Sequence, residues 1–259
     1  MAQALIRGEF GTGWKPQLPD IHDKVLSAAR FGGAVIPAHR DDRASMPPVY
    51  NQKNTNSCTG QGTAGALQYM RRKQGLEDFI PSRMFIYYNG RAMDGSQGFD
   101  GGSQVRNVIK SVATSGACSE TDWTFDTSHI NSRPTDKCYT DAKTDLVTSY
   151  AAVPQDIDAI RACLAHDIPI VFGFSIYSQF ESDAMAQSGM LEMPGTFSIQ
   201  LGGHCVVACG YSDKSKVVIC RNSYGSDWGD KGYFYVPYSY VCNPGLAADF
   251  WQIDVVAGK

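Results

Sequence analysis

The pattern of this chain changes from helical to strand-like near Pro169, and this change most restricts how the chain can fold. Before it, apolar residues recur at helical spacing; after it, Val, Ile, Phe and Tyr gather in short runs bounded by turn residues. A run of helices followed by a run of strands predicts an α+β fold with two lobes. The expected helices span 58–74, 82–93, 103–114 and 155–166, and the expected strands span 170–177, 204–211, 216–221, 232–237 and 250–256.

The two lobes define the expected domain boundaries. We expect one domain over residues 46–259, with a helical lobe at about 50–150 and a β lobe at about 151–256. Residues 124–154 lack a clear period and are predicted to be mainly loop. Residues 1–45 form a separate N-terminal extension, in which proline and charge favour extended structure with one short helix near 22–30.

Composition excludes several classes of partner. The net charge of −3, without a basic block, argues against nucleic acid and anionic membranes. No apolar run approaches the roughly 18 residues of a membrane helix. The N-terminus lacks an apolar signal-peptide region, which leaves the cytoplasm or a non-classical export route open. No phosphate loop or dinucleotide turn appears, so no cofactor is expected, and we expect a monomer.

Eight cysteines are many for a reducing compartment and few for a disulfide scaffold. Cys118 and Cys138 lie in polar sequence and form the favoured disulfide pair, although spacing alone does not determine the connectivity. Apolar segments hold Cys205, Cys209 and Cys220, where a free thiol acts as a small hydrophobe. With His204 these three could be considered as zinc ligands, but they lack the paired close spacings of structural zinc, so no metal site is predicted.

Cys58 is the first candidate for chemistry, because it opens the predicted helix 58–74. A helix N-terminus favours a thiolate, which is the nucleophilic form of cysteine. Gly60, Gly62 and Gly65 follow within the same helix. Glycine costs about 1 kcal/mol inside a helix, so three of them indicate close packing against another element.

His204, Asn222 and Gln52 supply the groups that a cysteine nucleophile requires. His204 begins a predicted strand after Gly202-Gly203 and can serve as general base and acid. Asn222 lies 18 residues further on, and its amide can orient the imidazole, with Trp228 shielding that bond from water. Gln52 precedes Cys58 by six residues, and its amide can join the Cys58 backbone N–H in an oxyanion hole.

These motifs resemble those of papain-like cysteine peptidases. The resemblance rests on Gln52, Cys58, Gly101-Gly102, His204 and the highly specific run Asn222-Ser223-Tyr224-Gly225-Ser226-Asp227-Trp228-Gly229. The segments 13–20 and 248–253 are similar to segments of the bacterial branch of that family. Over residues 46–256 the resemblance implies a helical left lobe, an antiparallel, barrel-like β lobe and an active site in the cleft between them.

The resemblance also implies how a substrate binds. Gly101 and Gly102 would hold a peptide or protein substrate in an extended conformation, where side chains would obstruct it. Gly173 and Gly203 would border an open specificity pocket that accepts a large apolar or aromatic side chain. Thr59 and Tyr224 stand where the family usually has aromatic residues, and Thr55 and Phe99 replace a disulfide that many secreted relatives carry; none of these changes removes a catalytic group.

The role of the N-terminal extension has two alternative interpretations. Trp14, Leu18, Ile21 and Phe31 are expected to be buried, so the extension either crosses the cleft like a short pro-segment or forms a non-inhibitory surface strap.

Three functions fit these residues. The favoured one is a cysteine endopeptidase that works through a thioester acyl-enzyme. The others are a cysteine-dependent amidase or acyltransferase, and a catalytically silent binding protein on the same fold.

Overall fold

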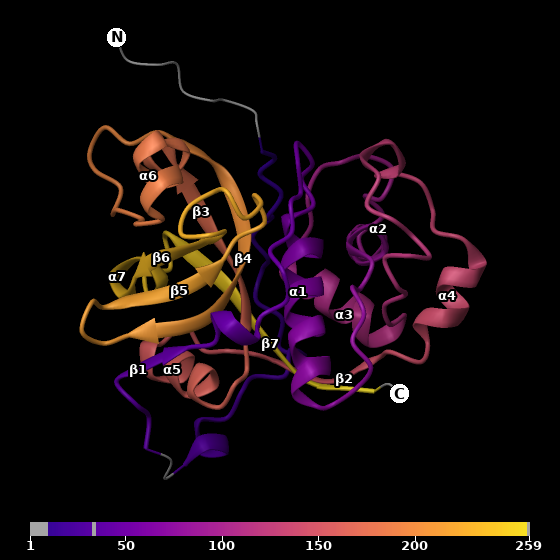
Figure 1. Cartoon of the computed structure of the whole chain (residues 1–259), viewed down its shortest axis with the longest axis horizontal. Helices are drawn as coiled ribbons and strands as arrows, with labels where there is room; N and C mark the ends of the chain where they lie inside the picture. The colour runs from indigo at the N-terminus through magenta and orange to yellow at the C-terminus, as the bar shows by residue number, and fades with distance from the viewer. Residues whose placement is uncertain (1–9, 33–34, 258–259) are drawn as a thin grey trace.

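The computed structural model describes residues 10–32 and 35–257 (Figure 1). The helices before residue 143 lie on one side of the molecule, and most strands lie on the other side together with the later helices (Figure 1). The helices are α1 Cys58–Lys73, α2 Arg83–Ala92, α3 Val105–Thr114, α4 Asp136–Ala142, α5 Ile157–Ala165, α6 Asp183–Ser188 and α7 Tyr238–Val241, with 3₁₀ turns η1 Ala28–Phe31, η2 Arg43–Ser45, η3 Thr127–His129 and η4 Ser178–Glu181. The strands are β1 His39–Asp41, β2 Val147–Ala152, β3 Ile170–Tyr177, β4 Gln200–Ser212, β5 Val217–Arg221, β6 Tyr233–Pro237 and β7 Ala247–Val256.

The expected helices and strands are confirmed to within a few residues, and the α+β class is confirmed with them. Gly75 has φ +68° one position beyond the C-cap of α1, a left-handed conformation that glycine adopts without steric cost. The interpretation of 124–154 as loop is wrong in part, because α4 and β2 lie within it. β2 is an edge strand with a mixed burial pattern, so its sequence lacks the apolar run of a central strand.

The strands form one seven-stranded antiparallel sheet in the order β2-β7-β3-β4-β5-β6, and β1 pairs with β4 outside this path. In the part of the chain that the structure describes, the sheet is open, since β2 and β6 lie at opposite ends. α1 packs across the sheet on β4 and β7, and α2 and α3 pack against one another and against α1.

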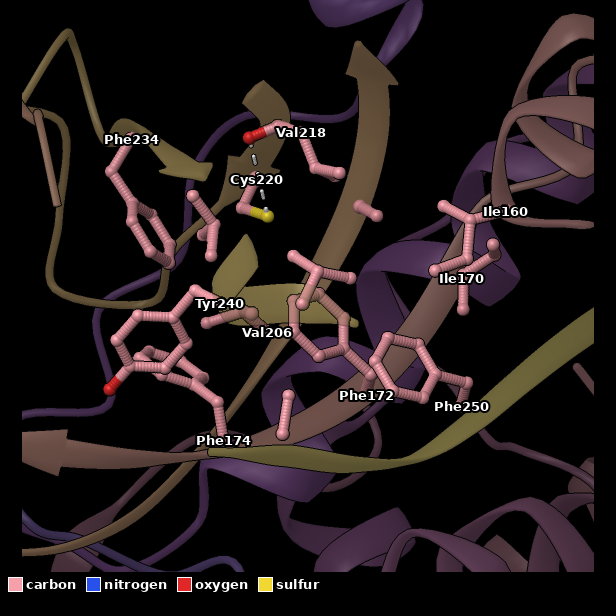
Figure 2. Close-up of a cluster of buried hydrophobic side chains, with 14 of the residues drawn as sticks. Ile160, Ile170, Phe172, Phe174, Val206, Val218, Cys220, Phe234, Tyr240 and Phe250 are labelled. Carbon is pink, nitrogen blue, oxygen red and sulfur yellow. Dashed lines mark hydrogen bonds between the residues drawn. The ribbon is translucent and has the colours of Figure 1, made fainter. Parts of the chain in front are cut away.

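The sheet buries a different core on each face, because strand residues alternate between faces. Phe172, Phe174 and Val206 point away from α1 into a cluster that includes Phe234 and Phe250 (Figure 2). The other face packs on α1 and α3, with these residues from the sheet: Val171, Cys205, Val207, Cys209, Ile219, Trp251 and Ile253. Two cores that share one sheet tie the helices firmly to the strands.

All eight cysteines, each within the described residues, are free thiols, so the expected Cys118–Cys138 disulfide is absent. Both thiols are buried in a small apolar cluster with Phe85 and Ala142. Burial in apolar surroundings explains why these cysteines appear in otherwise polar sequence.

Phe172→Ala should lower the free energy of unfolding by about 3–5 kcal/mol, because it leaves a cavity where the ring stacks on Phe250 at 4.8 Å between centroids. Urea unfolding followed by tryptophan fluorescence measures the change. Phe197→Ala is the matched control, since Phe197 is 95% exposed, and it should leave the midpoint unchanged. Equal effects of the two changes would contradict the assignment of Phe172 to the core.

Candidate active site

Cys58 is the first residue of α1, as expected, and its side chain is fully buried. The backbone N–H groups of Cys205, Gly13 and Thr59 all lie at the thiol and favour its ionised form. Cys205 belongs to β4, so the start of α1 meets the sheet at the nucleophile.

His204 lies within β4, not at its beginning, because the strand starts at Gln200. It pairs in register with Phe174 of β3, and its ring lies 4.9 Å from that of Tyr224 between centroids. Cys205, the next residue, faces α1, as strand alternation predicts. His204 is fully buried, like Cys58.

Asn222 directly follows β5, and its Oδ1 lies 2.7 Å from Nε2 of His204. The same oxygen accepts the backbone N–H of Ser223 at 2.8 Å, which fixes the orientation of the amide. Because Oδ1 can only accept, Nε2 carries the imidazole proton. Nδ1 therefore has a lone pair, and it has no hydrogen-bond partner among the described residues.

Gln52 is fully buried and linked to the segment that holds Asn222. Its backbone N–H donates to the Ser223 carbonyl at 2.8 Å, and its Oε1 accepts the Ser223 hydroxyl at 2.6 Å. Ser223 thus connects Gln52 with Asn222. The sequence analysis quoted Ser223 within its motif but assigned it no role.

Residues 10–15 run through the space between Gly102-Ser103 and β4 (Figure 1). Ser103 donates its N–H to the Gly13 carbonyl at 2.8 Å and accepts that of Lys15 at 3.0 Å, while the Trp14 N–H donates to the Gly203 carbonyl at 3.1 Å. We call residues 10–27 the N-terminal strap. Its first part is bound as an extended strand, and the expected binding residues Gly102 and Gly203 contact it.

The strap also reaches the catalytic groups. Gln52 Nε2 donates to the Gly11 carbonyl at 3.0 Å and to the Thr55 carbonyl at 2.8 Å, so both amide hydrogens are occupied. Phe10 stacks on Tyr224 at 3.9 Å between ring centroids. The strap therefore covers Cys58, Gln52 and the ring of Tyr224 beside His204.

Glycine is required where the strap passes the loop before Cys58. A Cβ on Gly13 would lie 1.7 Å from the Asn56 carbonyl oxygen, and one on Gly11 would lie 2.2 Å from that of Thr55. Backbone atoms make both contacts, so the loop cannot yield by rotating a side chain.

Trp14 fills the space beside Gly173 and Gly203. A Cβ on Gly173 would lie 2.0 Å from Cε2 of the indole, and one on Gly203 would lie 2.6 Å from Cε3. Gly101 lies next to the strap binding site, and a Cβ on it would meet Phe99. Of the residues of the N-terminal extension that were expected to be buried, Trp14 is buried and Phe31 partly so, whereas Leu18 and Ile21 are exposed. The carbonyl of Leu18, not its side chain, contacts Arg106 of α3.

Burial under the strap opposes charge on both Cys58 and His204. It raises the pKa of the Cys58 thiol to about 12, despite the backbone N–H groups that lower it. Burial lowers the pKa of His204 to about 4, against the opposing effect of Asn222. The depressed thiol pKa that the helix start suggested is therefore not found in this closed arrangement, because desolvation outweighs the helix terminus.

Trp228 shields the hydrogen bond between Asn222 and His204 less directly than expected. Its ring packs on Phe180 and Tyr224, and the centroid of Tyr224, not that of Trp228, lies within 4.9 Å of the His204 ring. Within residues 10–32 and 35–257 no group of three His, Cys, Asp or Glu could hold a metal ion, and no helix has the length and apolarity to span a membrane.

A buried thiol, an oriented imidazole and two amides, gathered between a helix and a sheet, define a cysteine-dependent hydrolase. The family model of the papain family cysteine protease matches residues 36–249. The chain belongs to this family, which establishes it as a cysteine protease with the two-lobed papain-like fold.

Individual relatives support this membership. An uncharacterized peptidase C1-like protein of Acanthamoeba polyphaga mimivirus is 36% identical over 215 residues, which cover 80% of this chain and 69% of the viral protein. The crystal structure of xylellain, a cysteine protease from Xylella fastidiosa, matches with a TM-score of 0.87 and 35% identity, over 96% of this chain and 97% of that one. A Carica candamarcensis cysteine protease in complex with E-64 shares the fold, with a TM-score of 0.63 and 18% identity over 83% of this chain and 97% of the other.

Iodoacetamide should alkylate Cys242 before Cys58 at pH 7, because Cys242 is only partly buried whereas Cys58 is fully buried. A pKa raised to about 12 leaves Cys58 less ionised at pH 7 than a free cysteine, so its alkylation should accelerate as the pH rises. Peptide mapping by mass spectrometry gives both rates. Faster labelling of Cys58 at neutral pH would show that the strap does not cover it in solution.

Proposed function

We propose that the chain hydrolyses peptide bonds with Cys58 as nucleophile, His204 as general base and acid, Asn222 orienting His204, and Gln52 binding the oxyanion. The observation that carries these roles is the bond of Asn222 to Nε2 of His204, which leaves Nδ1 with a free lone pair. The family membership favours this function over an acyltransferase or a silent binding protein.

The reaction follows from the positions of these groups. Nδ1 of His204 takes the Cys58 proton, and the thiolate attacks the carbonyl carbon of the substrate. The resulting oxyanion accepts hydrogen bonds from Gln52 Nε2 and from the Cys58 backbone N–H. His204 then protonates the leaving amine and afterwards draws a proton from the water that cleaves the thioester, which restores the thiol.

The substrate binds as an extended strand along the edges that the strap now uses. Gly101 and Gly102 admit its backbone, and Gly173 and Gly203 leave a pocket for one large side chain. The strap's own bonds to Ser103 and Gly203 support this path, because a peptide backbone already fits there.

The strap keeps the enzyme latent. It occupies the path of the substrate, and the Gly11 carbonyl uses the Gln52 hydrogen that an oxyanion needs. Its removal lets water reach the site, so the pKa of Cys58 falls and that of His204 rises, and the ion pair required for attack can form.

Gly13→Val should displace the strap, since even a Cβ at Gly13 lies 1.7 Å from a backbone oxygen. We expect kcat/KM toward peptide–coumarin amides to rise by about tenfold or more as the open population grows. Leu18→Ala, at an 82% exposed position of the strap, is the control and should leave the rate unchanged. If Gly13→Val leaves the rate unchanged, latency through the strap is excluded.

A peptide epoxide should label Cys58, and His204→Ala should abolish the labelling because no base remains to remove the thiol proton.

Gln52→Ala should lower kcat by about 10²–10³ through loss of one oxyanion donor. His39→Ala, which changes an exposed histidine of β1, should behave as the parent chain. All variants are made in the Gly13→Val chain and followed by mass spectrometry and steady-state kinetics. An unreactive Cys58 in the Gly13→Val chain, once its strap is shown to be displaced, would refute the catalytic roles.

A further inference from the structure

The pocket that Trp14 fills ends in a carboxylate. The indole lies on the backbone of β3 and β4 at Gly173 and Gly203, and its Nε1 donates to Asp249 Oδ2 at 2.8 Å. Asp249 belongs to β7, whose residue Ala248 pairs with Gly173. The pocket therefore has the glycine backbone of two strands as its walls and the Asp249 carboxylate at its far edge.

The backbone at Asp249 has two irregular features that affect the direction of its side chain. Asp249 has φ +61°, a left-handed conformation that non-glycine residues adopt at an energetic cost. The β3–β7 ladder also shifts register between Val171 and Gly173, which is typical of a bulge that redirects a neighbouring side chain. Both features belong to the backbone of β3 and β7, and the hydrogen bond to the indole places the Asp249 carboxylate at the end of the pocket.

We propose that Asp249 determines substrate specificity by selecting a tryptophan side chain, whose indole N–H replaces that of Trp14 once the strap has left. This inference rests on the proposed function, in which substrate and strap share one path. Trp14 of the strap therefore indicates which side chain the pocket prefers in a substrate.

The selection follows from the cost of an acceptor without a donor. Asp249 is partly buried, and its Oδ2 also accepts the Gln17 N–H at 3.1 Å while the strap is bound. A phenylalanine in the pocket would bring no donor to Oδ2, and an unpaired polar group costs about 1–3 kcal/mol when it is fully buried. Burial raises the pKa of Asp249 to about 6, while its bonds to Trp14 and Gln17 lower it. The charged groups that influence this carboxyl pKa are Arg106, which favours the ionised form, and Asp23, which opposes it. At pH 7.5 Asp249 is therefore mainly ionised while the strap is bound, and an ionised carboxylate only accepts hydrogen bonds.

Peptide–coumarin amides test the selection directly. In the Gly13→Val chain, each position is varied in turn among tryptophan, phenylalanine and 2-naphthylalanine, which matches the indole in size but has no N–H. We expect one position to favour tryptophan over both others by about tenfold in kcat/KM. Asp249→Gly should remove this preference without backbone strain, since glycine adopts φ +61° freely. Equal rates for the three side chains at every position would overturn the proposal.

A second measurement needs no catalysis. The alkylation rate of Cys58 reports opening of the strap, so Trp14→Phe should raise it by about tenfold or more in the otherwise unmodified chain. In the Asp249→Gly background the same change should have a clearly smaller effect, because only the loss of packing remains. Equal effects in both backgrounds would overturn the role of Asp249. If no peptide is cleaved but this coupling is present, the proposed hydrolysis fails, while the recognition of an indole by Asp249 stands.

Discussion

The close approach of α1 to the sheet is the contact on which the rest of the structure depends. A Cβ at Gly65 would lie 2.6 Å from Nη1 of the buried Arg221, and one at Gly60 would lie 2.8 Å from the Arg83 carbonyl oxygen. Glycine therefore lets α1 lie against both β5 and α2. This packing brings Cys58, at the start of the helix, to the backbone N–H of Cys205 in β4, one residue from His204. Glycine weakens the helix but allows the packing that places Cys58 at β4.

Desolvation connects the path of the strap to the chemistry of the site. Cys58 and His204 are fully buried while residues 10–15 cover them, and burial moves both pKa values toward the neutral forms. An arrangement that only obstructed the substrate would leave the thiolate–imidazolium pair intact and the thiol open to oxidation. A strap that excludes water from the pair also protects the thiol, because the thiol is far less reactive than the thiolate.

The sequence predicted most of the fold, because long periodic segments such as 58–74 and 170–177 carry their pattern locally. It missed β2, whose edge position requires no continuous apolar run, and it paired Cys118 with Cys138, which are buried free thiols. Cys58, His204, Asn222 and Gln52 could be named because their motifs are specific. Asp249 could not be singled out, because its proposed role depends on its positive φ and on a bulge in the pairing of β3 with β7. These two strands are separated by about 70 residues of sequence, so no local pattern reveals their contact.

Latency and selectivity are coupled if strap and substrate use one pocket. The strap is tethered, so it competes at an effective concentration of roughly millimolar, and a free peptide with the same contacts would rarely displace it. Any change that improves the fit of an indole strengthens the binding of both Trp14 and a substrate tryptophan. The ratio of strap-bound to substrate-bound protein is then still set by the effective concentration of the tethered strap. Activation must therefore act on the strap outside the pocket. The ion pairs of Asp23 with Arg106 at 2.5 Å and Lys110 at 3.2 Å hold that part of the strap on α3, so weakening them would favour the release of Trp14 from the pocket.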